Sequence, residues 1–362
     1  MPKQNEETMN KDTIEDSLTL FEQLPTELIQ KYIAPYLSSE GLASLSKTST
    51  TMFSHCQYPA AKRLLSHVVK GEEAGALEMI DANPRLLLIP SQVTDYSGRS
   101  YQDFTPFQAA LLCHDVILWK KIEPYFDKLP EGQAEKARQF QAIFPQGLPE
   151  QKPYDFRILI QVISVSSDTE IKAALEQTQN DTKICQALTT FRSDFTAVAM
   201  KETFFNPLHL NKAFEVYNEQ LSTWSWNQLD LFWRQVIGYI QRFLPACYAQ
   251  AFCRGLYPLV IDVVEEKMSF ERSLNFSIGS YSYYPLSESS GLGFDFGILY
   301  FPQHRMEGSV PTTEGAEMNF YKLCRAKQQN YLDLSIACST TDNPSRAAGN
   351  DHLTSRSWCT IS

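Results

Sequence analysis

The hydrophobic pattern begins with two short helical stretches near the N-terminus. Apolar residues recur at helical spacing between Leu24 and Leu37, which predicts a helix. The sequence from Ser38 to Gly41 breaks that pattern, and a second apolar set from Leu42 to Phe53 predicts another short helix. This segment is too small to hold a stable core by itself, so we expect it to pack on a neighbouring domain or to bind a partner.

Residues 60–128 repeat one order of elements: helix, tight turn, helix, long turn, helix, tight turn and helix. Gly71 ends the first of these helices, and Asn83-Pro84 ends the second. The sequence Asp95-Tyr96-Ser97-Gly98 is a turn signal, and Thr105-Pro106 places a proline in the first turn of the next helix. This order is typical of a helical repeat architecture.

The rest of the chain predicts a larger helical domain. Residues 145–153 are rich in proline and glycine and mark a boundary, after which residues 154–272 have mostly helical spacing. Apolar and polar positions then alternate on both sides of the turn-like stretch 285–293, which predicts a β-hairpin with a long loop. The alternating apolar residues are Leu274, Phe276 and Ile278 on one arm and Phe294, Phe296, Ile298 and Tyr300 on the other.

Together these patterns predict a mainly α fold in five parts. The first helical hairpin and the repeat unit precede the larger domain, which closes with a helix from about Glu317 to Cys338. The polar ends of the chain are expected to be flexible. The predicted parts are a leader (1–19), the helical hairpin (20–58), the repeat unit (60–144), the helical domain (154–338, with its β-hairpin at about 272–301) and a tail (339–362).

Composition and charge remove several classes of function. Aromatic residues make up 12% of the chain, which argues against general disorder. A net charge of −10 has the wrong sign for a protein that binds nucleic acid by neutralising phosphates, and it disfavours anionic membrane surfaces. The polar start has no apolar core of a signal peptide, and no uninterrupted run of about 18 apolar residues predicts a transmembrane helix.

Residues that usually bind metals or carry catalysis are scattered. None of the six histidines has the spacing of a zinc site, and none of the eight cysteines forms a CxxC pair. The spacing of Cys253 or Cys324 to His304 does not indicate a catalytic pair, and the glycines at 291–293 indicate a turn rather than a phosphate loop. We therefore expect no metal, no cofactor and no catalytic residue, and we interpret the cysteines as reduced thiols.

The segment Leu24-Pro25-Thr26-Glu27-Leu28-Ile29 resembles the start of an F-box, whose pattern begins Leu-Pro-x-Glu. The chain departs from that family at Pro35, within the first helix, and at Met52-Phe53, where a tryptophan is usual. The resemblance implies docking on the Skp-type adaptor of a cullin–RING ubiquitin ligase; the alternative is a hairpin that only packs on the next domain. The docking residues that it implies are Leu24, Pro25, Leu28, Ile29, Ile33, Leu37 and Leu42.

The segment Thr105-Pro106-Phe107-Gln108-Ala109-Ala110 resembles the ankyrin signature Thr-Pro-Leu-His-x-Ala. Two recognisable repeats are fewer than independent stability normally needs, so the flanking regions would have to cap them. The resemblance implies a protein-binding finger at about 95–103 that presents Tyr96, Arg99 and Tyr101 to an unknown protein target. The alternative is an ordinary α-helical domain.

The final residues, Cys359-Thr360-Ile361-Ser362, match a C-a-a-X prenylation box in which serine at the last position favours a farnesyl group. Farnesyltransferase would then modify Cys359 and direct the protein partly to membranes. The alternative is an inert free cysteine.

The three signals together resemble effectors that intracellular bacterial pathogens deliver into the host cytosol. That resemblance implies a non-catalytic substrate receptor, or scaffold, that brings a host cullin–RING ligase to a protein target at a membrane. Two alternatives stay open: a prenylated ankyrin scaffold that recruits no ligase, and an enzyme of unknown chemistry in residues 154–338.

Overall fold

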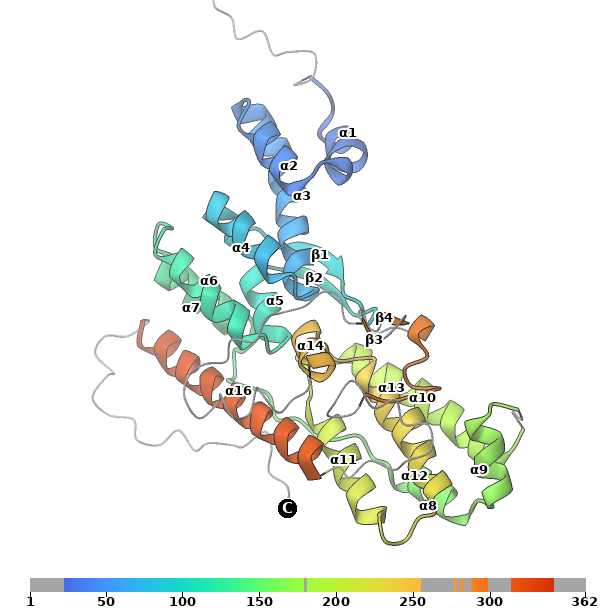
Figure 1. The fold of residues 1–362 in the computed structure, drawn as a ribbon. Helices are drawn as coiled ribbons and strands as arrows, with labels where there is room; N and C mark the ends of the chain where they lie inside the picture. The colour runs from blue at the N-terminus through green and yellow to red at the C-terminus, as the bar shows by residue number, and fades with distance from the viewer. Residues whose placement is uncertain are drawn as a thin grey trace, which may run out of the picture. The chain divides into compact units, whose positions relative to one another are not determined.

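The structure is a computed structural model that describes residues 23–178, 181–254, 277–278, 281–282, 288–298 and 314–341. The fold is mainly α with short antiparallel β-hairpins, which confirms the predicted fold class (Figure 1). The chain divides into two compact units, Met1–Ala60 and Ala61–Ser362. The predicted leader and most of the predicted tail, including the C-a-a-X box, lie outside the described residues.

The described part of the N-terminal unit is helical. Its segments are α1 (Thr26–Leu28), the π-helical η1 (Ile29–Ile33), the 3₁₀ turn η2 (Ala34–Tyr36), α2 (Ser39–Ser46) and the start of α3 (Thr50–Val69). Ser38 caps α2 by accepting a hydrogen bond from the Gly41 N–H at 3.0 Å, so the break predicted here is the start of a helix. The apolar pattern around Met52 and the one at residues 64–69 lie on a single helix, because Pro59 removes one hydrogen bond of α3 without ending it.

In the second unit, a β-hairpin separates helical pairs. The elements are α4 (Glu73–Ala82), η3 (Pro84–Leu88), β1 (Ser91–Thr94), β2 (Ser100–Phe104), α5 (Pro106–Leu112), α6 (Val116–Phe126) and α7 (Gly132–Ile143). Thr105 begins α5 with a capping box: its hydroxyl accepts from the Gln108 N–H, and the Gln108 side chain accepts from the Thr105 N–H at 3.1 Å. The helix start predicted at Thr105-Pro106 is therefore confirmed.

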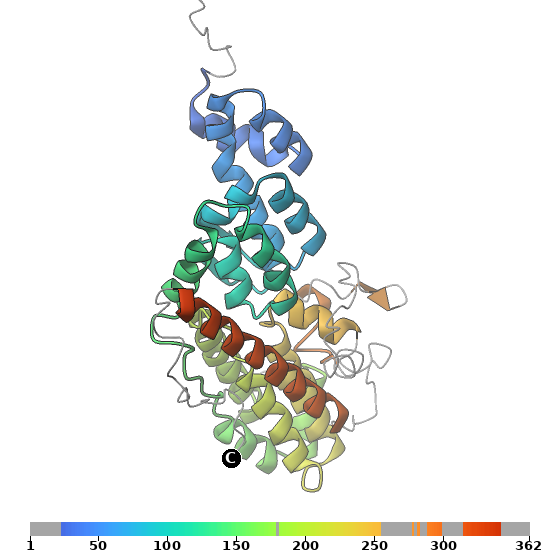
Figure 2. The same cartoon turned by 90° about the vertical axis from the view of Figure 1, so that its left-hand side faces the viewer.

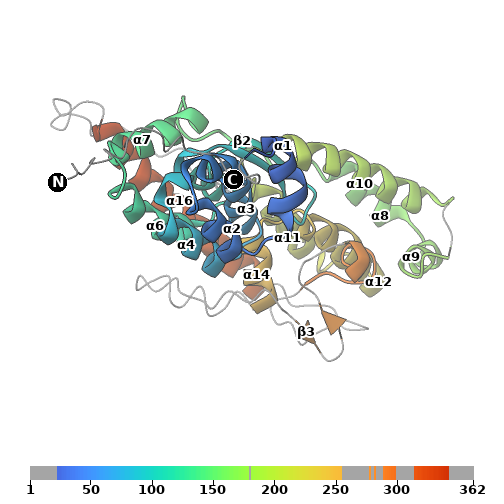
Figure 3. The ribbon, with the colours of Figure 1, turned by 90° about the horizontal axis from the view of Figure 1, so that it is seen from above.

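The same unit continues through a second group of helices, which Figures 1 and 3 show away from α6 and α7. Serine and threonine caps begin several of them, including a capping box at Ser167 and another at Ser225. The elements are α8 (Arg157–Val165), α9 (Asp168–Leu175), α10 (Lys183–Lys201), α11 (Leu208–Gln220), α12 (Trp226–Phe232), η4 (Trp233–Ile237), α13 (Gly238–Gln241) and α14 (Ala246–Arg254).

Helix α16 (Glu314–Thr341) joins the two groups of helices. It packs against both α7 and α11, and Figure 2 shows it lying across them. Residues 145–153 connect the groups as predicted, but both groups belong to one compact unit. The two compact units divide at Ala60, close to where the predicted hairpin (20–58) meets the predicted repeat unit (60–144).

The predicted β-hairpin differs in its pairing. A short antiparallel pair joins β3 (Ser277–Ile278) to β4 (Tyr281–Ser282), whereas the predicted second arm, near Phe294, is a turn. Gln241 explains this, because its side chain accepts from the Ile298 N–H at 2.7 Å and donates to the Ile298 carbonyl at 2.8 Å. A side chain thus satisfies the backbone groups that a strand would pair, and Gly238 permits the close approach of this segment.

Candidate functional site

The N-terminal unit has a small core built by residues from η2, α2 and α3. Ala34, Leu42 and Cys56 are buried together, and Leu37, Leu45 and Ala60 pack partly against them. The Thr26 hydroxyl and His55 Nδ1 lie 2.7 Å apart and tie α1 to α3. Met52, which the F-box resemblance would align with the usual tryptophan, is buried.

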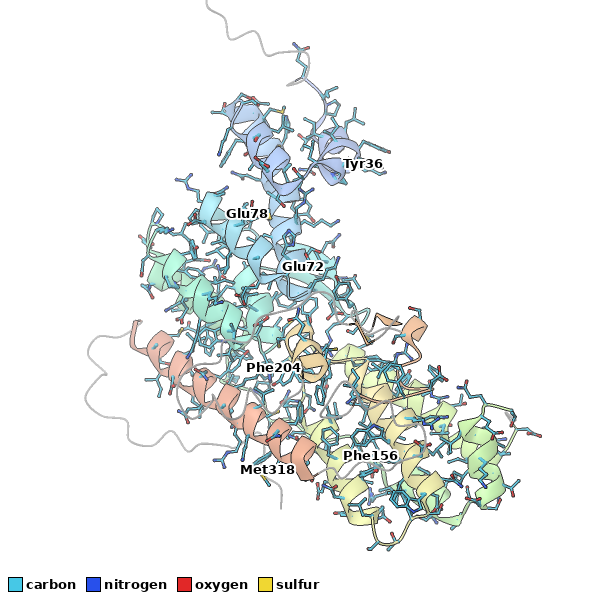
Figure 4. The ribbon with its side chains drawn as sticks, in the orientation of Figure 1. Tyr36, Glu72, Glu78, Phe156, Phe204 and Met318 are labelled. Carbon is cyan, nitrogen blue, oxygen red and sulfur yellow. The ribbon has the colours of Figure 1, made fainter. Side chains whose placement is uncertain are left out.

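One face of the first helical segment is apolar and exposed. Leu28, Tyr32 and Tyr36 lie four residues apart along α1, η1 and η2, so they share one side of the segment. All three are exposed; Tyr36 is 85% exposed and projects from the helix in Figure 4. Lys31 Nζ lies 5.3 Å from the centre of the Tyr32 ring. We call Pro25, Leu28, Tyr32 and Tyr36 the N-terminal apolar face.

The predicted docking residues divide into two groups in the structure. Pro25 and Leu28 are exposed, whereas Leu24, Ile33 and Leu37 are half-buried. Ile29 and Leu42 are fully buried in the N-terminal unit, so their prediction as docking residues is corrected: both hold the helices together. Tyr32 and Tyr36, which are exposed on the same segment, were not among the predicted docking residues.

The second predicted binding region is the turn between β1 and β2. Asp95 Oδ1 accepts hydrogen bonds from the Ser97 N–H, the Ser97 hydroxyl and the Arg99 N–H at 2.6–3.1 Å. Gly98 has φ of +85°, a conformation that favours glycine. The turn predicted at 95–98 is therefore confirmed, and the hairpin precedes a helical pair, α5 and α6.

Two of the three predicted contact residues of this turn are buried. The Tyr101 hydroxyl donates to Asp95 Oδ2 at 3.1 Å and lies 3.1 Å from Cys113 Sγ. Arg99 Nη2 donates to the Ala199 carbonyl on α10 at 3.1 Å. Their prediction as exposed partner contacts is wrong, because both side chains join the hairpin to the helices behind it. Only Tyr96 of the three is exposed.

A buried polar cluster lies where α5, α14 and α16 meet. Lys327 Nζ donates to the His114 carbonyl at 2.6 Å and lies 3.7 Å from Cys247 Sγ. The His114 ring lies among Phe204, Phe205, Tyr248 and Tyr331, with centroids 4.4–6.2 Å away. No sequence pattern predicted this cluster, because its residues come from four segments that lie far apart along the chain.

The chemistry of this cluster indicates a structural role. Burial raises the pKa of the Cys113 thiol far above its usual value, which keeps it protonated. Burial, with the charges of Lys327 and Arg99, lowers the pKa of His114 well below its usual value. A protonated thiol and a neutral imidazole with buried surroundings do not form an activated nucleophile. We interpret the cluster as a set of polar contacts that attach α16 to the other helices of the second unit.

Within the described part of the chain, no three histidine, cysteine or acidic side chains are placed to hold a metal ion. None of the described helices is long and apolar enough to cross a membrane. The predicted lipid site, Cys359, lies outside the described residues, as does His304.

Comparison with known proteins relates this chain to bacterial proteins of unassigned function. Residues 209–337, from α11 into α16, match the family described as the CBUA0006 C-terminal domain. The chain is also 24% identical over 250 residues to the uncharacterized protein CBUA0006 of Coxiella burnetii, an intracellular pathogen. That match covers 66% of this chain and 63% of the relative, so the chain spans less than two thirds of the relative's length. No solved structure matches the chain.

Proposed function

We propose that this protein is a bacterial effector that acts as a non-catalytic scaffold, with the N-terminal unit docking on the Skp-type adaptor of a host cullin–RING ubiquitin ligase. The second unit would then hold a protein target, and farnesylation of Cys359 would place the complex at a membrane. The ligase partner would supply the transfer chemistry, and the scaffold would raise its rate by proximity.

The observation that carries this proposal is the N-terminal apolar face on a separate compact unit. Monomeric proteins rarely keep a row of large apolar side chains in water without a use for it. The tyrosines of this row belong to a residue type that is enriched at protein interfaces. The segment also begins with the Leu-Pro-x-Glu sequence on which the F-box resemblance rests. The relation to a Coxiella burnetii protein supports a bacterial setting in which a host ligase would be available.

Adaptor binding tests the docking part of the proposal directly. The variant Leu28→Ser/Tyr32→Ser removes two exposed apolar side chains and leaves the buried core of the unit in place. We expect its affinity for a purified Skp-type adaptor to fall at least about tenfold, because central apolar contacts at interfaces commonly contribute about 2 kcal/mol or more. Isothermal titration calorimetry with the full chain measures this change.

The matched control is Leu88→Ser, which removes an exposed leucine from the second unit. It should bind the adaptor as the unaltered protein does. Equal affinity of all three proteins, or no adaptor binding by the unaltered chain, would overturn ligase recruitment. In that case the prenylated scaffold without a ligase would be the better description.

A further inference from the structure

Two arginines of the second unit lie over the same pair of aromatic rings. Arg192, on α10, has its guanidinium carbon 4.3 Å from the centre of the Phe294 ring and 5.9 Å from that of Tyr239. Arg242, which directly follows α13, lies 5.7 Å and 4.9 Å from the same two centres. The ring centres are 6.4 Å apart, so the two guanidinium groups lie within about 8 Å of one another, which is the screening length at physiological salt.

The partners of Arg192 do not neutralise this pair of like charges. Its Nη2 donates to the neutral side chain of Gln235 at 2.8 Å, and its Nε has no acceptor among the described residues. Burial, together with the positive charge of Arg242, lowers the pKa of Arg192. Asp295, on the turn that carries the shared ring, accepts a hydrogen bond from Gln177 Nε2 at 3.2 Å. An anion bound by both arginines would relieve their repulsion.

The pair borders the predicted binding finger of the second unit. Arg242 lines a small hollow, open to solvent on one side, together with Tyr96 and Ser97 of that finger. Leu244 and Ala246 form part of the apolar wall of the hollow. Tyr96 is the exposed one of the three predicted finger contacts, so a partner chain that touches it can also reach Arg242.

We propose that Arg192 and Arg242 form an oxyanion site, which takes a carboxylate from an acidic segment of the protein target. This inference rests on the proposed role of the second unit in holding that target. Guanidinium groups present their N–H donors in a planar fork that matches a carboxylate, and stacking on aromatic rings holds the fork in place. Free inorganic phosphate has the same oxyanion chemistry, but the position of the pair beside the finger favours a group that a protein carries.

Acidic peptides test the site in the full chain at physiological ionic strength, where repulsion by the net charge of −10 is largely screened. The probe is hexaglutamate with a neutral fluorophore, and hexaglutamine is its uncharged match. We expect Arg192→Gln/Arg242→Gln to bind hexaglutamate at least about tenfold more weakly than the unaltered protein does, because charge-assisted hydrogen bonds are lost. Fluorescence anisotropy measures these affinities.

The matched control is Arg138→Gln/Arg157→Gln, which removes the same amount of charge from two exposed arginines of the second unit. It should bind hexaglutamate as the unaltered protein does. An equal loss in both double variants would show that only the net charge matters, and it would overturn the site. Equal affinity of the unaltered protein for the two peptides would do the same.

Modification of arginines by phenylglyoxal, located by mass spectrometry, uses the unaltered chain and so does not depend on whether a variant folds. Hexaglutamate should protect Arg192 and Arg242 and leave Arg138 and Arg157 reactive, whereas hexaglutamine should protect none of them. Protection by inorganic phosphate without protection by hexaglutamate would overturn the assignment to a protein carboxylate. If hexaglutamate binds through the arginine pair but the adaptor does not bind, the oxyanion site stands and ligase recruitment fails. If the adaptor binds but hexaglutamate does not, only the oxyanion site fails.

Discussion

At the scale of single residues, the finger of the second unit shows how burial changes the role of a side chain. Tyr96, Arg99 and Tyr101 have the composition of a binding site, but the hairpin turns two of them inward. Arg99 bonds to a carbonyl a hundred positions away, and no local sequence signal reveals such a partner. Asp95 and Gly98 are different, because their turn chemistry is local and was therefore predictable.

Substitution of the two tyrosines of the finger should separate a structural residue from a surface residue. Tyr101→Ala removes a fully buried ring and should lower the free energy of unfolding by about 3–5 kcal/mol. Tyr96→Ala removes a partly exposed ring and should change it by about 1 kcal/mol or less. Urea denaturation followed by circular dichroism measures both values. A stable Tyr101→Ala variant would contradict the inward position of this ring.

His114 predicts a pH dependence of stability. Its pKa is lowered well below the usual value in the folded protein, first by burial and then by Lys327 and Arg99. The unfolded chain therefore takes up a proton near pH 6.5 while the folded chain does not, so this group stabilises the fold above that pH. As the pH falls below about 6.5, the contribution should decrease by up to about 1.4 kcal/mol per pH unit.

The matched variant for this prediction is His114→Asn. Asparagine tolerates the left-handed backbone of this position, where φ is 56°, and it does not titrate. Between pH 8 and pH 5.5, the melting temperature should fall less steeply for this variant than for the unaltered protein. Parallel curves would mean that His114 is protonated in the folded state.

At the scale of elements, the sequence predicted where helices begin better than it predicted which residues they contact in the fold. The start of α5 was predicted at Thr105-Pro106, and there Thr105 and Gln108, three positions apart, form a capping box. The alternation around Phe294 predicted a strand, but the structure has a turn there. The Gln241 side chain bonds to the N–H and carbonyl of Ile298, which a strand partner would otherwise pair. The N-terminal segment was predicted at the right place, whereas the burial of Ile29 and Leu42 depends on packing that spacing alone does not define.

Helix α16 should be required for the folding of the second unit. Its Tyr331 is fully buried, donates a hydrogen bond to the Leu111 carbonyl and packs on Phe204. Tyr331→Ala should therefore destabilise this unit by about 3–5 kcal/mol. Chemical denaturation measures the loss, and Ile336→Ala on the exposed side of the same helix is the control. Similar stabilities of the two variants would show that α16 is only loosely attached.

At the scale of the whole molecule, the proposal divides the work between separate parts of the chain. The N-terminal unit would hold the adaptor, the second unit the target, and the C-terminal box the membrane. The region similar to the CBUA0006 C-terminal domain lies in the second unit, so that relation does not depend on the F-box-like sequence. A division of this kind predicts that one activity can be removed while another is kept.

Cys359→Ser provides that separation. In a eukaryotic cytosol we expect this variant to lose most of its membrane fraction, because it lacks the thiol to which the farnesyl group would be attached. Adaptor binding should be unchanged, since the N-terminal apolar face belongs to a separate unit.

Fractionation of the unaltered protein and the variant, each with and without a farnesyltransferase inhibitor, measures the membrane fraction. Co-purification of the adaptor measures adaptor binding. The inhibitor should shift only the unaltered protein. Equal membrane fractions in all four samples would show that the C-terminal box does not determine where this protein resides, and a parallel loss of the adaptor would show that docking depends on the membrane.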